Sequence, residues 1–442
     1  MKIFRSNSRS GSALLVTVAT TAIMGIGIAS YLAMTSFQSR SSMRSQVYNS
    51  ILPIAEAGVE EALSHLYFHS SNLSTDNWTQ VSYLSLSNGI NLSGTVFYKQ
   101  RVFGEGRYTV AVLQSSSPSI VSQGYVPLPF QTNELIRTVE VATASQSLFM
   151  KGLVAKGSIG LVGSVQTDSF DSSDPAYSTS GSYDSLKSKD NGDIASVSTA
   201  ANVISANGNV SVYGHVSTGP GGTISTTGNA AMGSKSFING GGSGIESGWS
   251  SDDMNASFPD VQAPFSGGAF TPASGSVGGT NYTYVLGNGN WQMSSLSMSG
   301  KKKMMVNGNA VLYVTGNISM AGQAYIEIAP GASLHLYGAG SSTSLSGQGI
   351  ANSNSNATNF FYYGLPSNTS LSLSGNSAFT GVIYAPQADF SMSGGGSTSY
   401  DLVGAGIVNT ISMNGHFNFH YDEALEDLNS GAGYVVTSWN EL

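Results

Sequence analysis

An uncharged, mostly apolar run near the start of the chain constrains its folding more than any other feature. The run extends from Ser10 to Phe37, follows the basic head MKIFRSNSR, and precedes the next basic residue, Arg40. As a helix, residues 12–37 would be roughly 39 Å long at 1.5 Å per residue, which is enough to cross a bilayer. By the positive-inside rule the basic head stays in the cytoplasm and the rest of the chain is exported.

The boundary between the basic head and the apolar run decides whether the helix is kept after export. A secretory signal normally has a shorter apolar core that ends in small residues at a cleavage site. Here Gly11 precedes the apolar core, and no A-x-A site closes it. A plain signal anchor is also compatible with this composition, so composition alone leaves that alternative open.

The sequence remains compatible with a helix after the apolar run. Between Ile51 and Leu66, apolar residues recur at spacings of three and four, which predicts an amphipathic stripe with glutamates on the other faces. Pro53 lacks a backbone N–H and is expected to kink the helix rather than end it, because the stripe continues past it. Residues 12–66 would then form one helix of about 80 Å.

Three short stretches of this region point to a known family. They are the basic leader MKIFRSNSRSG, the junction GSALLV and the segment AEAGVEEAL at 55–63. Together they resemble type IV pilins, specifically PilX-like minor pilins, over roughly the first seventy residues. In that family a prepilin peptidase cuts after the glycine and methylates the new N-terminus. The resemblance therefore implies cleavage between Gly11 and Ser12, which removes a leader (1–11) and retains a transmembrane and amphipathic helix (12–70).

The fifth residue after the implied cut departs from the family pattern. Most pilins have a glutamate there, whose carboxylate pairs with the N-terminal amine of the subunit above it, whereas this chain has Val16. A carboxylate in the membrane core is costly unless it finds such a partner. Val16 therefore suits a tip or priming subunit that has nothing above it. Drift in a minor subunit would give the same residue, and both explanations remain open.

Composition limits what the remainder can be. The chain has 442 residues, with 54 glycines, no cysteine, 10% charged residues and 40% hydrophobic residues. This is too apolar for a disordered tail and long enough for two or three domains. The absence of cysteine fits an exported protein that does not rely on disulfides. The formal net charge is −8, and an acidic chain is a poor candidate for binding nucleic acid through a basic surface. The run KKKMM at 301–305 is expected to be a solvated patch beside a strand.

The middle of the chain predicts a small β-rich, pilin-like module at 71–147. Four strand-like segments with β-branched and aromatic residues support it, namely GTVFYKQRVF, RYTVAVLQ, PSIVSQGYVP and ELIRTVEVATA. A polar stretch near 164–200 is expected to be an insertion within the next domain. The next domain is placed at 148–425, and a C-terminal tail at 426–442.

A short motif, apolar-x-apolar-x-Gly, recurs through this large domain. It occurs as IGLVG, VSVYG, LSMSG, ISMAG, LHLYG, LSLSG, FSMSG and ISMNG, which start at 159, 210, 296, 318, 334, 371, 390 and 411. Starts from 296 onward differ by 22, 16, 37, 19 and 21 residues, and a partial match, TSLSG at 343, falls within the longest gap. The alternation predicts that Leu296, Met298, Leu371 and Leu373 point inward while serines point outward.

A spacing near twenty with one short strand per pass is typical of a parallel β-helix, in which each coil is buried only by its neighbours. The predicted fold class is therefore α+β: a long N-terminal pilin-type helix, a small antiparallel β module, and a right-handed parallel β-helix. A two-sheet sandwich is the competing architecture. The segment from GVIYAPQADF to HFNFHYDEAL also resembles the C-terminal domain attached to many PilX-like proteins.

Several acidic residues and one histidine are candidates for an active site, since many parallel β-helices act on polysaccharides. The candidates are Asp168, Asp171, Asp174, Asp190, Asp193, Asp252, Asp253, His420, Asp422 and Glu423. The aspartates lie in expected loops without calcium-loop spacing, which predicts turn residues. The last three are expected to form a surface cluster that caps the final coil. The histidines lack metal-ligand spacing, and no nucleophile elbow occurs, so we expect no enzymatic activity, metal or cofactor.

The sequence thus predicts a minor type IV pilin that takes part in pilus assembly near the filament tip and carries a large surface domain for adhesion or cell–cell contact. The expected partners are other pilins through the N-terminal helix, the prepilin peptidase, the bacterial inner membrane before assembly, and surface glycans or other cells, with no nucleic acid. One alternative is a large pseudopilin of a type II secretion system. The other is a membrane-anchored β-helical enzyme that acts on polysaccharides.

Overall fold

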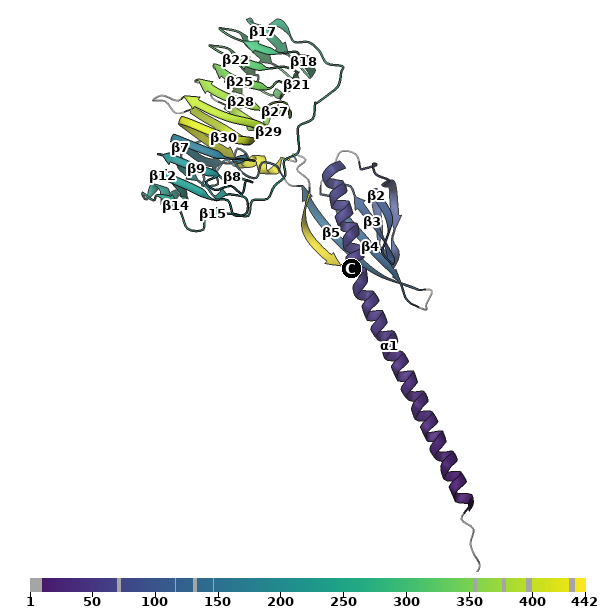
Figure 1. Cartoon of the computed structure of the whole chain (residues 1–442). Helices are drawn as coiled ribbons and strands as arrows, with labels where there is room; N and C mark the ends of the chain where they lie inside the picture. The colour runs from purple at the N-terminus through teal and green to yellow at the C-terminus, as the bar shows by residue number, and fades with distance from the viewer. Residues whose placement is uncertain are drawn as a thin grey trace, which may run out of the picture. The chain divides into compact units, whose positions relative to one another are not determined.

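The computed structural model forms two compact units, shown in Figure 1. Unit 1 comprises Met1–Gln146 and Gly433–Leu442, and unit 2 comprises Ser147–Ala432. The structure describes residues 10–69, 73–115, 117–129, 133–145, 147–347, 349–352, 356–375, 379–394, 400–428 and 434–442. Most of the leader predicted at 1–11 (residues 1–9) therefore lies outside the described residues.

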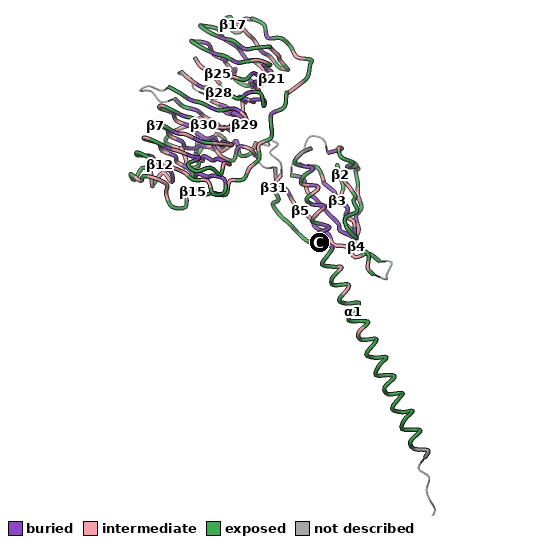
Figure 2. The backbone as a smooth tube through the Cα atoms, in the orientation of Figure 1, coloured by how far each residue is buried: buried purple, intermediate pink, exposed green. Residues whose placement is uncertain are grey.

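Unit 1 begins with the single long helix that the sequence predicts, α1 (Ser10–His69). Its apolar first half is exposed along its length, whereas Ile51, Ala55, Val59 and Leu66 on its second half are buried (Figure 2). These residues share one face because they are separated by three or four positions or multiples of them. Pro53 lies inside the helix, which continues beyond it. The kink at Pro53 stays a prediction.

The second half of α1 packs on an antiparallel sheet in the order β1-β2-β3-β4-β5-β31. The strands are β1 (Thr79–Ser85), β2 (Asn91–Phe103), β3 (Gly106–Leu113), β4 (Ser119–Pro127), β5 (Glu134–Ser145) and β31 (Tyr434–Glu441), with a short helix η1 (Ser87–Gly89). The predicted C-terminal tail therefore contains a strand. Its sequence, YVVTSWNE, is rich in β-branched and aromatic residues and pairs with the otherwise open edge of β5.

Two glycines allow α1 to lie close to this sheet. A Cβ atom on Gly58 would lie 2.3 Å from Ser122 Oγ, and one on Gly124 would lie 2.7 Å from the carbonyl oxygen of Ile51. Neither position can hold a larger side chain without moving the helix away from the strands. The glycine in the AEAGVEEAL segment is thus explained by close packing of helix on sheet.

Unit 2 is built almost entirely from parallel strands, arranged in rows. The first row runs β15 (Ser250–Ser251), β11 (Val216–Ser217), β8 (Ile194–Ser196), β6 (Leu153–Ala155), β30 (Tyr400–Asp422), β29 (Phe379–Gly394), β27 (Phe360–Gly364), β24 (Ser333–Gly338), β21 (Asn309–Val314), β18 (Gly289–Met293). The second row runs β12 (Ile224–Gly228), β9 (Ile204–Gly208), β7 (Ile159–Phe170), β30, β29, β28 (Ser370–Gly375), β25 (Ser342–Gly347), β22 (Ile318–Met320), β19 (Leu296–Met298).

Shorter groups of strands complete the stack. A five-stranded sheet runs β16 (Ala273–Val277), β17 (Thr280–Leu286), β20 (Lys303–Val306), β23 (Tyr325–Ile328), β26 (Gly349–Asn352), in which the β16–β17 pair alone is antiparallel. At the other end, β14 (Gly244–Ile245), β13 (Ala231–Gly233) and β10 (Ser211–Tyr213) extend the pairing of β7. The remaining helices are α2 (Lys235–Asn239), η2 (Ala357–Asn359) and η3 (Glu423–Asp427). Of the run at 301–305, Lys301 and Lys302 are exposed just before β20, whereas Met304 and Met305 are buried within it, so the prediction of a solvated patch is wrong for the methionines.

The second row aligns the repeated motif into continuous columns. One column consists of Leu296, Ile318, Thr343, Leu371, Phe390, Ile411, Ile159, Ile204 and Ile224. All but Ile224 are buried, as are Met298 and Leu373 two residues further along their strands. The predicted inward orientation is therefore confirmed. Two motif matches lie elsewhere: LHLYG forms β24 of the first row, and VSVYG forms β10.

The order of the strands in the stack differs from their order in the chain. From β6 and β7 the chain moves outward to β14 and β15, and residues 252–272 then carry it to β16–β18 at the opposite end. From there it passes through successive strands of the two rows back to β30, which pairs with β6 and β7 (Figure 1). The first and last strands of the two rows along the chain, β6 and β7 on one side and β30 on the other, are therefore neighbours in the middle of the stack.

The crossing segment, residues 252–272, lies along the outer side of the first row. The Met254 N–H donates to the Thr218 carbonyl oxygen next to β11, and Phe270 pairs with Trp291 of β18. Eight strand spacings separate these two points, about 38 Å at 4.8 Å each, which sixteen extended residues can span. Between them, the hydroxyl of Tyr384 on β29 donates to the Pro259 carbonyl oxygen, and Phe265 contacts the ring of Tyr313 on β21.

The structure thus confirms one long N-terminal helix followed by a large, mostly β domain with parallel sheets. Within the described residues these sheets do not close on themselves. The predicted polar insertion at 164–200 is shorter in the structure, because β7 continues to Phe170 and β8 begins at Ile194. The polar loop is residues 171–193.

Candidate functional site

The residues expected to direct processing and assembly lie in α1. Gly11 and Ser12 belong to its first turn, and Val16 is exposed on it. Ala13–Tyr67 contains an apolar window of mean hydropathy 1.9 whose residues are all unburied. By length and composition this helix could cross a membrane, either as an anchor or as part of a signal sequence.

Most of the acidic candidates hold turns in unit 2. Asp171 and Asp174 each accept a hydrogen bond from the backbone N–H two residues further on. Asp190 accepts from the Lys235 N–H, and Asp193 accepts from Lys151 Nζ. Asp252 and Asp253 are exposed at the start of the crossing segment. Across the described part of the chain, no three His, Cys, Asp or Glu residues are grouped so that they could hold a metal ion.

His420 and Asp422 are buried, so the prediction of a surface cluster is wrong for these two residues. They are 2% and 0% exposed, because β30 pairs with β7 on one side and the polar loop covers its end. His420 Nδ1 lies 2.5 Å from Oδ1 of Asp168, its directly paired residue on β7. The sequence predicts Asp168 to lie in a loop, whereas it lies in β7 beside His420.

Tyr183 from the polar loop completes this buried cluster. Its ring stacks on the His420 imidazole, and its hydroxyl donates to Asp168 Oδ2 over 2.7 Å. On the other side, Asp401 Oδ1 lies 3.6 Å from His420 Nε2. Burial alone would lower the pKa of His420, but its bonds to the Asp168 and Asp401 carboxylates outweigh burial, and the pKa is raised. The arrangement favours a charged imidazolium between two carboxylates.

Asp422 and Glu423 attach the polar loop to the end of β30. Asp422 Oδ1 accepts the backbone N–H groups of Ser172 and Ala424. Burial raises the pKa of Asp422. Glu423 accepts hydrogen bonds from Lys189, Asn191 and the Ser169 hydroxyl. These contacts give both residues a structural part in holding residues 171–193 in place.

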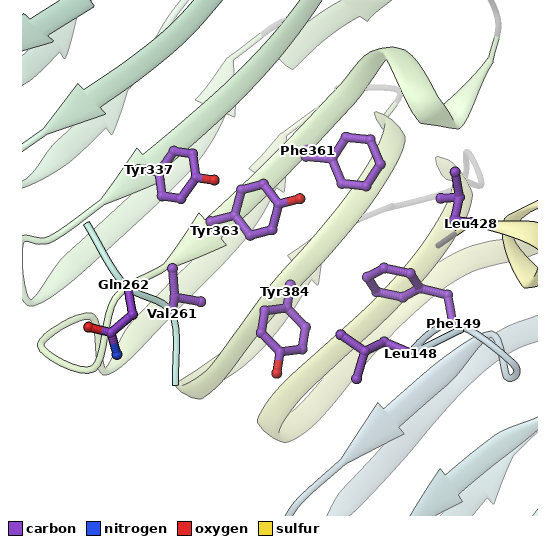
Figure 3. Close-up of a pocket in the computed structure, with 9 residues that line it drawn as sticks. All are labelled: Leu148, Phe149, Val261, Gln262, Tyr337, Phe361, Tyr363, Tyr384 and Leu428. Atoms are coloured by element: carbon purple, nitrogen blue, oxygen red, sulfur yellow. The ribbon is translucent and has the colours of Figure 1, made fainter. Parts of the chain in front are cut away.

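A separate groove of about 400 Å³ lies on the outer side of the first row (Figure 3). Nine residues line it, namely Leu148, Phe149, Val261, Gln262, Tyr337, Phe361, Tyr363, Tyr384 and Leu428. All of them belong to unit 2. The volume is within the usual range for pockets that bind small ligands.

Strand register puts the three tyrosines of the groove in line. Tyr337 on β24 is paired with Tyr363 on β27, which is paired with Tyr384 on β29. The rings of Tyr337 and Tyr363 stack with their centres 4.6 Å apart, whereas that of Tyr384 is turned by 67° relative to Tyr363. Phe149, which precedes β6, contacts Tyr384 edge to face.

The polar groups of the groove are neutral. No acidic or basic side chain is among its nine lining residues. Burial raises the pKa of the Tyr337 and Tyr363 hydroxyls and lowers that of the neighbouring His335. The tyrosines therefore keep their protons at neutral pH, and His335 remains uncharged.

The groove could not be predicted from the sequence, because its lining comes from six separate stretches of the chain. The only available signal was a tyrosine that recurs near the ends of LHLYG, FFYYG and VIYAP. The glycine motif accounts for LHLYG, and VIYAP lies in the segment that resembles a domain of PilX-like proteins, so neither pattern by itself indicates a groove. The three tyrosines align because β24, β27 and β29 are paired in this register. The spacing of the tyrosines in the sequence does not reveal that pairing.

Comparison with known proteins covers only part of the chain. A family model described as a domain of unknown function (DUF7305) matches residues 270–428, from the end of the crossing segment through β30 to η3. No curated protein and no solved structure is significantly similar to the chain.

Proposed function

We propose that the protein is a membrane-anchored, pilin-type subunit that displays unit 2 outside the cell. The division of α1 carries the proposal. Its first half exposes apolar residues such as Leu15, Ile26 and Phe37, while its second half is buried against the antiparallel sheet. An exposed apolar surface of this extent is unfavourable in water and requires a membrane, or the helices of other subunits, to cover it.

Within this class we favour a PilX-like minor pilin. Its leader would be removed after Gly11, and the helix would leave the inner membrane when the subunit enters a filament. Unit 2 is too large to be repeated easily along a tightly packed shaft but is accommodated once at an end. Val16 suits that end, because a subunit with nothing above it gains nothing from a glutamate there.

We further propose that unit 2 is a right-handed parallel β-helix. Parallel pairing in two long rows and the continuous inward column from Leu296 to Ile224 support this fold. Its role would be contact with other cells or surfaces, to which the outward serines and threonines contribute polar groups. An experimental structure of unit 2 tests the handedness directly.

The processing step is tested by mass spectrometry of the mature protein. We expect its N-terminus to be Ser12, carrying a methyl group. A mature N-terminus beyond residue 30 would indicate ordinary signal cleavage and would exclude the pilin proposal. A blocked peptidase should leave the full chain in the membrane fraction.

Antibody labelling against unit 2 tests the position in the filament. We expect one cluster per filament end, and fewer filaments when the gene is deleted. Val16→Glu should leave filament number unchanged or reduced. Even labelling along the shafts would exclude the tip model, whereas a requirement for protein secretion without filaments would favour the pseudopilin alternative. Turnover of polysaccharides by the purified chain would favour the enzyme alternative.

A further inference from the structure

We propose that the groove lined by Tyr337, Tyr363 and Tyr384 is a binding site for a neutral glycan. The inference rests on the proposed function, which places unit 2 outside the cell, where glycans occur. It adds to that function a class of ligand. It also identifies the part of unit 2 that makes the contact.

The lining has the mixed character that a sugar requires. Phe149, Phe361, Leu148 and Leu428 supply apolar contacts, and the hydroxyls of Tyr337 and Tyr363 and the Gln262 amide supply donors and acceptors. The Tyr384 hydroxyl already donates to the Pro259 carbonyl oxygen. A pyranose ring combines apolar C–H faces with hydroxyl groups along its edge, so both kinds of surface find partners. A wholly apolar acyl chain would offer the Tyr337 and Tyr363 hydroxyls no hydrogen-bond partner, at a free-energy cost.

Charge and backbone pairing argue against two other kinds of ligand, anionic groups and peptides that bind by adding a strand. Because no cationic side chain lines the groove, phosphate, sulfate and uronate groups have no counter-charge there. A peptide could bind by adding a strand only where backbone N–H and C=O groups are free. The floor strands β24 and β27 are each paired on both sides, with β21 and β27 and with β24 and β29 respectively, so they offer no free edge.

The walls of the groove are held in place by contacts that need no ligand. Tyr384 donates its hydroxyl to Pro259, and Gln387 Nε2 donates to Asp260 Oδ1 over 2.7 Å. These bonds fix the crossing segment immediately before Val261 and Gln262. The site is therefore formed in advance, which reduces the entropy lost when a ligand binds.

Binding of neutral hexasaccharides to the purified full-length chain tests the inference. The probes are cellohexaose, maltohexaose and hexa-N-acetylchitohexaose, with an oligogalacturonate as the acidic comparison, in a detergent that lacks a sugar headgroup. We expect saturation-transfer NMR to detect at least one neutral probe and titration to show weaker binding of the acidic one. Tyr363→Ala should weaken binding by about tenfold or more, and Gln262→Ala by about threefold.

Two variants keep the outcome interpretable. Tyr363→Phe retains the ring, so it should fold normally and lose only the contribution of the hydroxyl. Tyr325→Ala on β23 changes a tyrosine outside the groove and should bind as the wild type does. Binding that survives both Tyr363→Ala and Gln262→Ala, preference for the acidic probe, or no binding of any neutral probe would overturn the inference. Since this assay needs no filament, its failure leaves the localisation experiments unaffected, and their failure leaves the binding result unaffected.

Discussion

Unit 2 contains two halves, residues 147–251 and 273–428, that share the same rows but differ in build. In the later half, most strands have four to seven residues, and the inward positions are mostly Leu, Ile, Met and Phe. In the earlier half, most strands have two to five residues, and the second inward column passes through the smaller Ala206 and Thr226. The matched family model covers the later half alone.

The two halves are joined by the pairing of β30 with β7, two strands that lie far apart in the chain. Twelve consecutive residue pairs join β30 (Ile411–Asp422) to β7 (Ile159–Phe170). We call this junction the seam. Each half would end in an exposed edge without the other, and the seam removes both edges. The seam is therefore expected to be a strong part of the stack although it joins segments far apart in the sequence.

The largest expected effect comes from a glycine column that crosses the seam. Gly394, Gly415, Gly163, Gly208 and Gly228 are paired in succession, all with positive φ. A Cβ atom on Gly415 would lie 1.9 Å from the Gly394 carbonyl oxygen. Gly415→Ala should therefore destabilise unit 2 by about 4 kcal/mol or more in thermal or denaturant unfolding.

Gly300→Ala is the matched control for this column. Gly300 ends the same motif with φ of +65°, but nothing lies within 4 Å of its Cβ position. Gly300→Ala should lower the free energy of unfolding by only about 1 kcal/mol, the usual penalty of the left-handed conformation. Equal destabilisation by the two substitutions would show that the backbones of β29 and β30 are not in tight contact at Gly394 and Gly415, beside the seam.

The next effect concerns the buried partner of His420. Asp168→Asn should cost about 3 kcal/mol, because it leaves a buried imidazolium without its closest counter-charge. Asp401→Asn changes the other, 59% exposed carboxylate of the same histidine and should cost less than about 1 kcal/mol. If the seam joins the halves into one folding unit, Asp168→Asn should shift a single unfolding transition. Two separate transitions would indicate that the halves unfold independently.

A smaller effect is expected from pH. Because the pKa of His420 is raised in the folded state, its stabilising contribution is complete below the unfolded value near 6.5 and is lost as the pH rises through the folded value. Asp168, Asp401 and Tyr183 are the titratable groups that face it. The unfolding midpoint should therefore fall from pH 6 toward alkaline pH, and His420→Gln should flatten this slope. An unchanged slope in His420→Gln would assign the pH dependence to other groups.

The smallest effect is expected from cutting the crossing segment. Ser266, Gly267 and Gly268 are exposed, so a protease site inserted there should be cleaved in the folded protein. In a variant that ends at Leu428, and so lacks β31, the two fragments should still elute together, because the seam holds them. Their separation under native conditions would mean that the covalent crossing, not the seam, joins the halves.

Local features of this fold were predictable, and the stacking order was not. The long helix and the inward positions of Leu296, Met298, Leu371 and Leu373 follow from periodicity. Periodicity cannot show that β30 stacks on β7, since the bond between His420 and Asp168 joins residues 252 positions apart. Nor does it separate the rows, because LHLYG and LSMSG have the same pattern but lie in different ones. Predicting the tyrosine groove would require both the stacking order of the strands and the row to which each strand belongs.

The place where β31 joins unit 1 has a mechanical consequence. The chain leaves unit 1 after β5 and returns to it in β31, and the ends of these two strands nearest unit 2 are paired, Ser145 with Tyr434. A force on unit 2 is therefore carried by two covalent connections that load adjacent strands from the same end. Both strands are then pulled in the same direction, so they share the load, and the force acts along the pairing of β5 with β4 rather than separating β31 from β5. Unit 2 should therefore stay attached to unit 1 under a pulling force more firmly than a domain joined through a single connection.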